Sequence, residues 1–167
     1  MTPADLLTDS LGRVLESVEA VLDGADETLL TERPGPDANT IGWLVWHLTR
    51  VQDDHVADVA GTDQVWTADG YDDRFGLPLE TRDIGYGHSS EQVALVRAPA
   101  SLLADYHRAT HRRTLAYVAT LAPEDLDRVV DTRWDPPVTL GARLVSVVND
   151  CTQHVGQAAY VRGLLAR

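Results

Sequence analysis

Apolar residues recur every three or four positions along four long stretches of the chain, a spacing that places them on one face of a helix. In the first stretch, for example, Leu7, Leu11 and Val14 share such a face. Polar residues that favour a helix start precede two of the stretches, Thr40 before the second and Thr139 before the fourth. The pattern predicts long helices over residues 2–24, 39–61, 99–121 and from 139 nearly to the C-terminus.

The segment between the second and third predicted helices, residues 62–98, is long and rich in glycine. A connection of this length in a compact domain is usually a functional loop. Within it, Ser89-Ser-Glu-Gln92 matches a capping box and predicts a short helix. Single helical turns are expected around residues 25–31 and 123–126, and no alternation typical of a strand stands out. We therefore expect an all-α fold: a single domain over residues 1–167, built as a four-helix bundle with a long loop and short helix between helices two and three.

The composition narrows the class of protein. The formal net charge is −12, which argues against binding to nucleic acid and to anionic membranes, because both need a basic surface. The single cysteine, Cys151, rules out an internal disulfide and is expected to be a buried small residue. No stretch approaches the roughly 18 apolar residues of a membrane span, and the first residues do not resemble a signal peptide. A soluble, cytoplasmic protein is expected.

A polar stripe on the fourth predicted helix contains a candidate metal-binding pair. Asp150 and His154 are four residues apart, so their side chains share a helix face. A third ligand could come from His47 on the second helix, and two histidines with one carboxylate form a common catalytic zinc set. Two alternatives remain open: the stripe is a solvated face, and His47 is a hydrogen-bonded core residue.

Three further residues are candidates for the surroundings of this site. Asp54 lies two turns along the helix from His47 and could orient its imidazole. His88 stands where the long loop enters its short helix, and Gln157 continues the polar stripe beyond Asp150 and His154. We expect these three side chains to lie in or beside the pocket, although a surface position is an equal alternative for Asp54.

A second histidine pair, His107 and His111, has the same four-residue spacing. Arg108, Arg112 and Arg113 surround it, and their positive charge opposes the binding of a divalent cation. We therefore expect this pair to be solvated and not to bind metal.

Four segments of the chain resemble a known superfamily, the DinB-like (YfiT-type) four-helix bundles, in the branch of mycothiol-dependent transferases and isomerases. The resemblance implies that a histidine of the second helix and a pair on the fourth bind metal, and these positions correspond to His47, Asp150 and His154. The first member of the pair is usually His or Glu, whereas this chain has Asp. The segments that support the resemblance are Thr40–Leu48, Gly85–Val93, Trp134–Ser146 and Asp150–Tyr160.

The resemblance also implies a chemistry. A divalent metal, zinc in the first place and nickel as an alternative, would hold a low-molecular-weight thiol as its thiolate, which attacks a small electrophilic molecule. Mycothiol is the implied thiol, and family members are often homodimers. Arg74 and Arg82 in the long loop are candidates to hold an anionic substrate, with ordinary surface arginines as the alternative. Two other functions remain open: a non-catalytic stress protein that binds metal or a small ligand, and a hydrolase in which the open metal position holds water.

Overall fold

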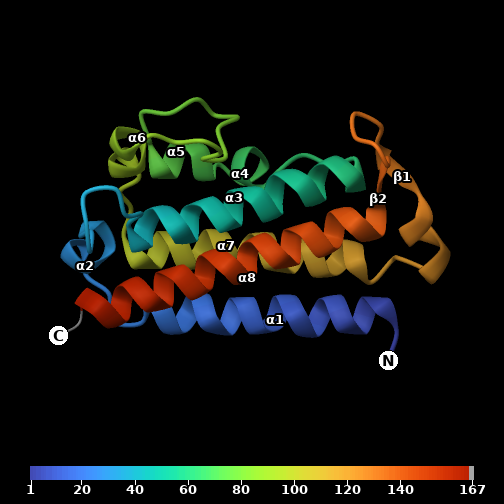
Figure 1. Ribbon diagram of the computed structural model, residues 1–167, viewed down its shortest axis with the longest axis horizontal. Helices are drawn as coiled ribbons and strands as arrows, with labels where there is room; N and C mark the ends of the chain where they lie inside the picture. Colours follow the sequence, from blue (N-terminus) through green and yellow to red (C-terminus); the bar gives the residue numbers. More distant parts are fainter. Residues whose placement is uncertain (166–167) are drawn as a thin grey trace.

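The long helices of the chain lie side by side in a computed structural model that describes residues 1–165 (Figure 1). Helix α3 packs against both α7 and α8, and α1 contacts the same two helices from the other side. The predicted all-α class and the four long helical segments are confirmed. Their bounds are Pro3–Leu22 for α1, Ile41–Ala60 for α3, Ala100–Val118 for α7 and Leu140–Leu165 for α8.

The apolar faces of these helices form the core. On α8 the buried residues include Leu144, Val147, Cys151 and Val155, which are spaced three or four apart as in an amphipathic helix. The expected burial of Cys151 is confirmed. Among residues 1–165, none of the helices combines the length and hydrophobicity that crossing a lipid bilayer demands.

The connections contain more structure than the sequence pattern predicts. The expected turns are confirmed as α2 (Glu27–Thr31) and the 3-10 helix η1 (Pro123–Asp127), and the expected capping box begins α6 (Ser90–Leu95). Two further helices were not predicted, α4 (Val65–Ala68) and α5 (Tyr71–Phe75). Both are too short to show a helical period, and with α6 they lie over α3 in Figure 1.

A small β-hairpin precedes α8 and was likewise not predicted. Strand β1 (Val129–Asp131) pairs antiparallel with β2 (Val138–Thr139). Strands of three and two residues give no readable alternation, which is why the sequence pattern missed them. Thr139 then accepts a hydrogen bond from the backbone of Ala142 at 3.3 Å, so it begins α8 as expected.

A buried polar network ties the long connection to α3. The Arg50 side chain is fully buried and donates to the Gln64 side chain at 2.7 Å and to the backbone carbonyl of Asp83 at 3.1 Å. Asp53, one turn further, accepts from the backbone amides of Val65 and Trp66 at 2.8 Å each. A buried charge is tolerated only when it is paired and hydrogen-bonded, so this network fixes α4 and residues 81–83 on α3.

The second histidine pair is buried, and the expectation that it would be solvated is wrong. His107 is fully buried and His111 is 7% exposed. Nδ1 of His107 lies 3.0 Å from the hydroxyl of Thr49, whereas its Nε2 has no protein partner. Burial lowers the pKa of His107 to about 3. The pair faces the core because α7 packs between α1 and α3, while Arg108 and Arg112 lie on its exposed side.

Candidate metal centre

His47 of α3 and the pair Asp150 and His154 of α8 meet at one place. One potential ligand atom from each lies within 4.8 Å of the other two. His47 is buried, and the other two side chains are half-buried. The imidazole rings of His47 and His154 stand edge to face, with centroids 4.7 Å apart. The structure thus brings together the three residues that the sequence suggested as metal ligands.

Both imidazoles are oriented so that Nε2 stays free. Nδ1 of His47 lies 2.5 Å from the carbonyl oxygen of Ile84. A carbonyl only accepts, so Nδ1 carries the proton and Nε2 keeps its lone pair. Nδ1 of His154 is 2.9 Å from Oε1 of Gln157, which gives the same tautomer. Hydrogen bonds of this kind fix the imidazoles of metal-binding histidines.

Asp150 provides the third donor. Its Oδ1 is 3.6 Å from Nε2 of His154, a charge contact that is too long for a hydrogen bond. Its Oδ2 is buried and has no hydrogen-bond partner. A buried carboxylate oxygen without a partner is costly, and a cation would satisfy it. Together with the two free imidazole nitrogens it forms a donor set that fits a divalent metal such as zinc or nickel.

The two histidines differ in their affinity for a proton. The pKa of His154 is raised, first by the Asp150 carboxylate and further by Gln157, against the effect of burial. The pKa of His47 is lowered, mainly by burial and also by the neighbouring His154, although its hydrogen bond to Ile84 acts in the other direction. Of the two imidazoles, His154 therefore holds a proton more tightly than His47 does.

An aromatic wall supports His47. The ring of Trp43 stacks on the imidazole at 4.6 Å with an angle of 10° between the planes. The indole nitrogen of Trp43 donates to Nδ1 of His88 at 3.1 Å, and Nε2 of His88 donates to the Asp83 carboxylate at 2.9 Å. His88 therefore lies in the wall behind the candidate ligands and positions Trp43.

Gly85 allows the loop to reach His47, and its replacement tests this contact. A Cβ at this position would lie 2.8 Å from Nδ1 of His47 and 3.0 Å from the ring of Trp46, and its φ is +89°. Gly85→Ala should destabilise the protein by about 1–3 kcal/mol and, by displacing the Ile84 carbonyl, weaken metal binding by about 10–100-fold. Urea unfolding and metal titration measure the two effects.

Gly87 is the matched control for this substitution. Its φ is +72°, but a Cβ there meets no atom within 4 Å. Gly87→Ala should therefore show the backbone strain without the loss of metal affinity. Equal metal affinity in the Gly85→Ala variant and the wild type would contradict the proposed contact.

The structure places Asp54 elsewhere than expected. Its carboxylate lies 3.1 Å from Nδ1 of His55 and accepts from the Gln64 amide at 2.8 Å. The backbone carbonyl of Ile84 occupies the position beside His47 that Asp54 was expected to take. The contact with Ile84 could not be predicted from its residue type, because every residue has a backbone carbonyl. The one sequence signal for a close approach of this loop to His47 is the adjacent Gly85.

The two loop arginines lie in different surroundings. Arg74 stacks over the Tyr71 ring at 4.5 Å and faces Asp105 at 3.8 Å. Arg82 is 88% exposed and pairs with Glu80 at 2.9 Å. Arg82 is two residues before Ile84, whereas Arg74 belongs to α5. Of the two, only Arg82 is close in sequence to a contact of His47, and its role toward an anionic substrate stays a prediction.

Fold and site together define the class: a mostly helical protein with a candidate metal centre between two of its long helices. A sequence model of the mycothiol S-transferase family matches residues 6–167, and the chain belongs to this family. The resemblance seen in its motifs is thereby confirmed.

Among solved structures, the chain is similar to a conserved protein from Enterococcus faecalis. The two are 33% identical with a TM-score of 0.92, and the match covers 99% of this chain and 98% of the other. No curated protein matches the chain. The fold is therefore shared over essentially the whole length of both chains.

Proposed function

We propose that this protein is a divalent-metal-dependent S-transferase that joins mycothiol to small electrophilic molecules. The observation that supports this most is the convergence of His47, Asp150 and His154, with a buried carboxylate oxygen that has no protein partner. Membership of the mycothiol S-transferase family supports the choice of thiol. Zinc is the preferred metal and nickel the alternative, since both accept this donor set.

The protein residues supply binding and orientation. A divalent metal bound by the three ligands would lower the pKa of a thiol in its open position and so provide a thiolate at neutral pH. The Ile84 carbonyl and Gln157 hold the two imidazoles in the tautomer that leaves Nε2 free. Trp43 covers one face of His47 and excludes water from it.

The chain's own cysteine is a poor nucleophile, which favours a thiol that arrives as co-substrate. Cys151 is fully buried, and its Sγ donates to the Leu48 carbonyl at 3.5 Å. Burial raises the pKa of this thiol, and the thiolate is the reactive form. A cytoplasmic location would suit the reaction, because low-molecular-weight thiols stay reduced there. A homodimer remains a prediction from the family resemblance.

The test is thiol-dependent consumption of an electrophile by the metal-loaded protein. An aryl halide whose thioether product absorbs light is offered with mycothiol, with cysteine and without thiol. We expect turnover with mycothiol, loss of turnover after treatment with a chelator, and recovery when zinc or nickel is added back. The matched control is the Gln153→Ala variant, which changes an exposed residue beside the site and should keep full activity.

The other functions give different outcomes. Cleavage of an ester without thiol would support a hydrolase and overturn the transferase. Metal binding without turnover of either substrate would leave a non-catalytic binding protein. Equal rates with and without the chelator would overturn the metal dependence, whatever the substrate.

A further inference from the structure

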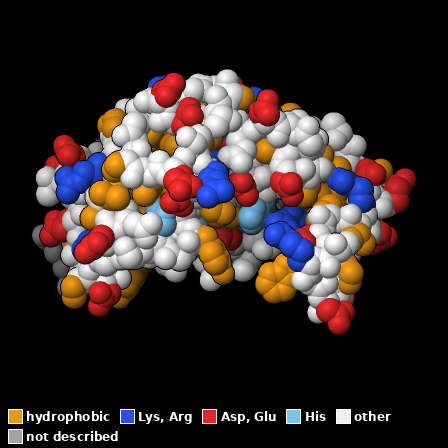
Figure 2. All heavy atoms as spheres, turned by 90° about the horizontal axis from the view of Figure 1, so that it is seen from above, with side chains coloured by type: hydrophobic (Ala, Val, Ile, Leu, Met, Phe, Trp, Pro, Cys, Tyr) orange, Lys and Arg blue, Asp and Glu red, His pale blue; other side chains and the backbone are white. Residues whose placement is uncertain are grey.

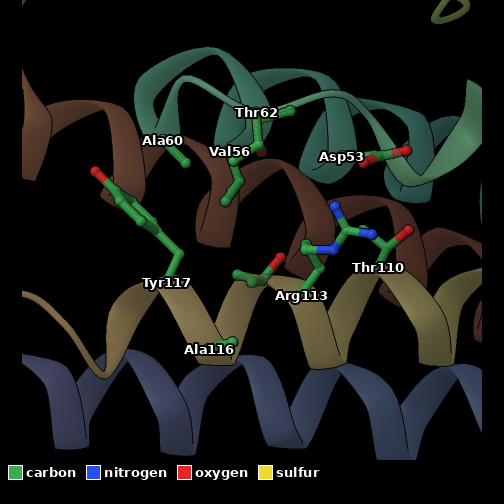
Figure 3. A pocket seen from close by; sticks show the side chains of 10 residues that line it. Asp53, Val56, Ala60, Thr62, Thr110, Arg113, Ala116 and Tyr117 are labelled. Carbon is green, nitrogen blue, oxygen red and sulfur yellow. The ribbon is translucent and has the colours of Figure 1, made fainter. Parts of the chain in front are cut away.

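A cavity that the candidate metal centre does not include lies between α3 and α7. Figure 3 shows Val56 and Ala60 of α3 on one side, and Arg113, Ala116 and Tyr117 of α7 on the other. On α3 the lining residues begin with Asp53, six positions beyond His47, and none of the residues that line the cavity is a candidate ligand. The cavity is therefore separate from the three candidate ligands, although one helix contributes to both.

The size and lining of the cavity suit one small ring. Its volume is about 190 Å³, and alanine and valine side chains form much of its wall. An engineered apolar cavity of about 150 Å³ in another protein binds benzene. Figure 2, which views the molecule from the side of α3, shows hydrophobic side chains scattered among many acidic ones.

The polar groups at the two ends of the cavity already have partners. The Asp53 carboxylate accepts from the amides of α4 and from the Tyr106 hydroxyl at 2.8 Å. At the other end the Tyr117 hydroxyl donates to the Val59 carbonyl at 3.3 Å and accepts from Arg128 at 3.1 Å. The polar groups at both ends are therefore hydrogen-bonded without a ligand.

Two polar groups on the α7 side of the cavity, by contrast, are not fully hydrogen-bonded. The Thr110 side chain is 1% exposed, and its hydroxyl has no hydrogen-bond partner in the described structure. Arg113, one turn further on the same face, extends along the cavity in Figure 3. Its guanidinium faces Asp69 at 3.7 Å, beyond hydrogen-bond distance, and both side chains are almost half exposed. A hydroxyl donor and a loosely paired guanidinium thus stand beside an apolar hollow.

We propose that this cavity binds a small aromatic carboxylate, with its ring against the alanine and valine side chains and its carboxylate on Arg113 and Thr110. The ring would bury apolar surface, and the carboxylate would accept charge-assisted hydrogen bonds from Arg113. The Thr110 hydroxyl would gain the partner that it lacks. The proposal does not depend on the transferase function, because it uses none of the metal ligands.

The test is a binding titration of the full-length protein followed by NMR, with benzoate and its neutral analogue benzyl alcohol as probes. Benzoate should bind, and benzyl alcohol should bind at least about tenfold more weakly, since it lacks the charge-assisted hydrogen bonds. Arg113→Gln should weaken benzoate binding by about tenfold or more. Arg112→Gln, which removes an exposed neighbouring arginine that does not line the cavity, should leave binding unchanged.

Two further variants locate the bound probe. Thr110→Val should weaken benzoate binding while keeping the shape of the side chain, and Ala57→Leu should abolish binding by filling the cavity. Circular dichroism checks that each variant is folded. His154→Ala should bind benzoate as the wild type does, and loss of binding there would place the carboxylate at the metal centre and overturn the proposal. No binding to the wild type, or equal binding of both probes, would also overturn it.

Discussion

Alanine at His154 or Asp150 is expected to release the divalent metal without unfolding the helices. Each substitution removes one of three donors, and Asp150→Ala also removes the negative charge of the site. Loss of an outer partner already costs about 10–100-fold in metal affinity, so loss of a ligand should cost at least about 100-fold. Elemental analysis of protein purified without a metal-affinity tag measures the metal, with about one ion per chain expected in the wild type.

Three comparisons separate ligand loss from general damage. Far-UV circular dichroism should be unchanged in both variants, because His154 and Asp150 are half-buried side chains at the edge of the core. Gln153→Ala changes an exposed residue between them and should keep the metal. Asp150→Asn keeps the shape of the side chain and should still lose most of the affinity. Full metal occupancy in the His154→Ala variant would contradict the proposed metal site.

Acid is expected to destabilise the protein through His107. Burial holds the pKa of this imidazole at about 3 in the folded state, against an ordinary value of 6.5. Below pH 6.5 the imidazole is therefore protonated in the unfolded chain but stays neutral in the folded one. The free energy of unfolding decreases as the pH is lowered, until the folded-state pKa is reached. This single group should remove about 4 kcal/mol between neutral pH and about pH 3.5, at about 1.4 kcal/mol per pH unit.

His107→Gln isolates this effect. The variant keeps a hydrogen-bonding side chain near Thr49 but cannot titrate. Urea unfolding of both proteins is measured across this pH range with a chelator present, so that loss of metal at low pH does not contribute. The difference in free energy of unfolding should move in favour of the variant as the pH falls. A difference that stays constant with pH would contradict a buried, neutral His107.

Sequence periodicity predicted the long helices well because each one buries a continuous apolar stripe. It failed for α4, which has only four residues and depends on Asp53 of a different helix for its first amide hydrogen bonds. The hairpin before α8 was missed for a similar reason: its strands are short, and Asp131 stabilises it through Arg133 and Arg143. Elements that depend on tertiary contacts leave little local pattern.

The candidate ligands could be found from the sequence because two of them share a helix face and their residue types are typical of metal sites. The environment of His47 could not be found in this way, since its partner is the carbonyl of Ile84. The burial of His107 was not predicted from the sequence, because arginines adjacent to it in the chain suggested exposed and positively charged surroundings for its side chain. Arg108 and Arg112 are each about 100° around α7 from the histidine before them, so their charge lies on another face.

The positions of the three ligands along the chain have a consequence for folding. His47 belongs to the second long helix and the other two to the last one, so an unfolded chain cannot present all three together. A metal ion that needs all three would act as a reversible cross-link between α3 and α8. Because such an ion binds the folded state in preference to the unfolded one, its free concentration sets part of the folding equilibrium. The resistance of this protein to unfolding would then follow the supply of metal to the compartment in which it is made.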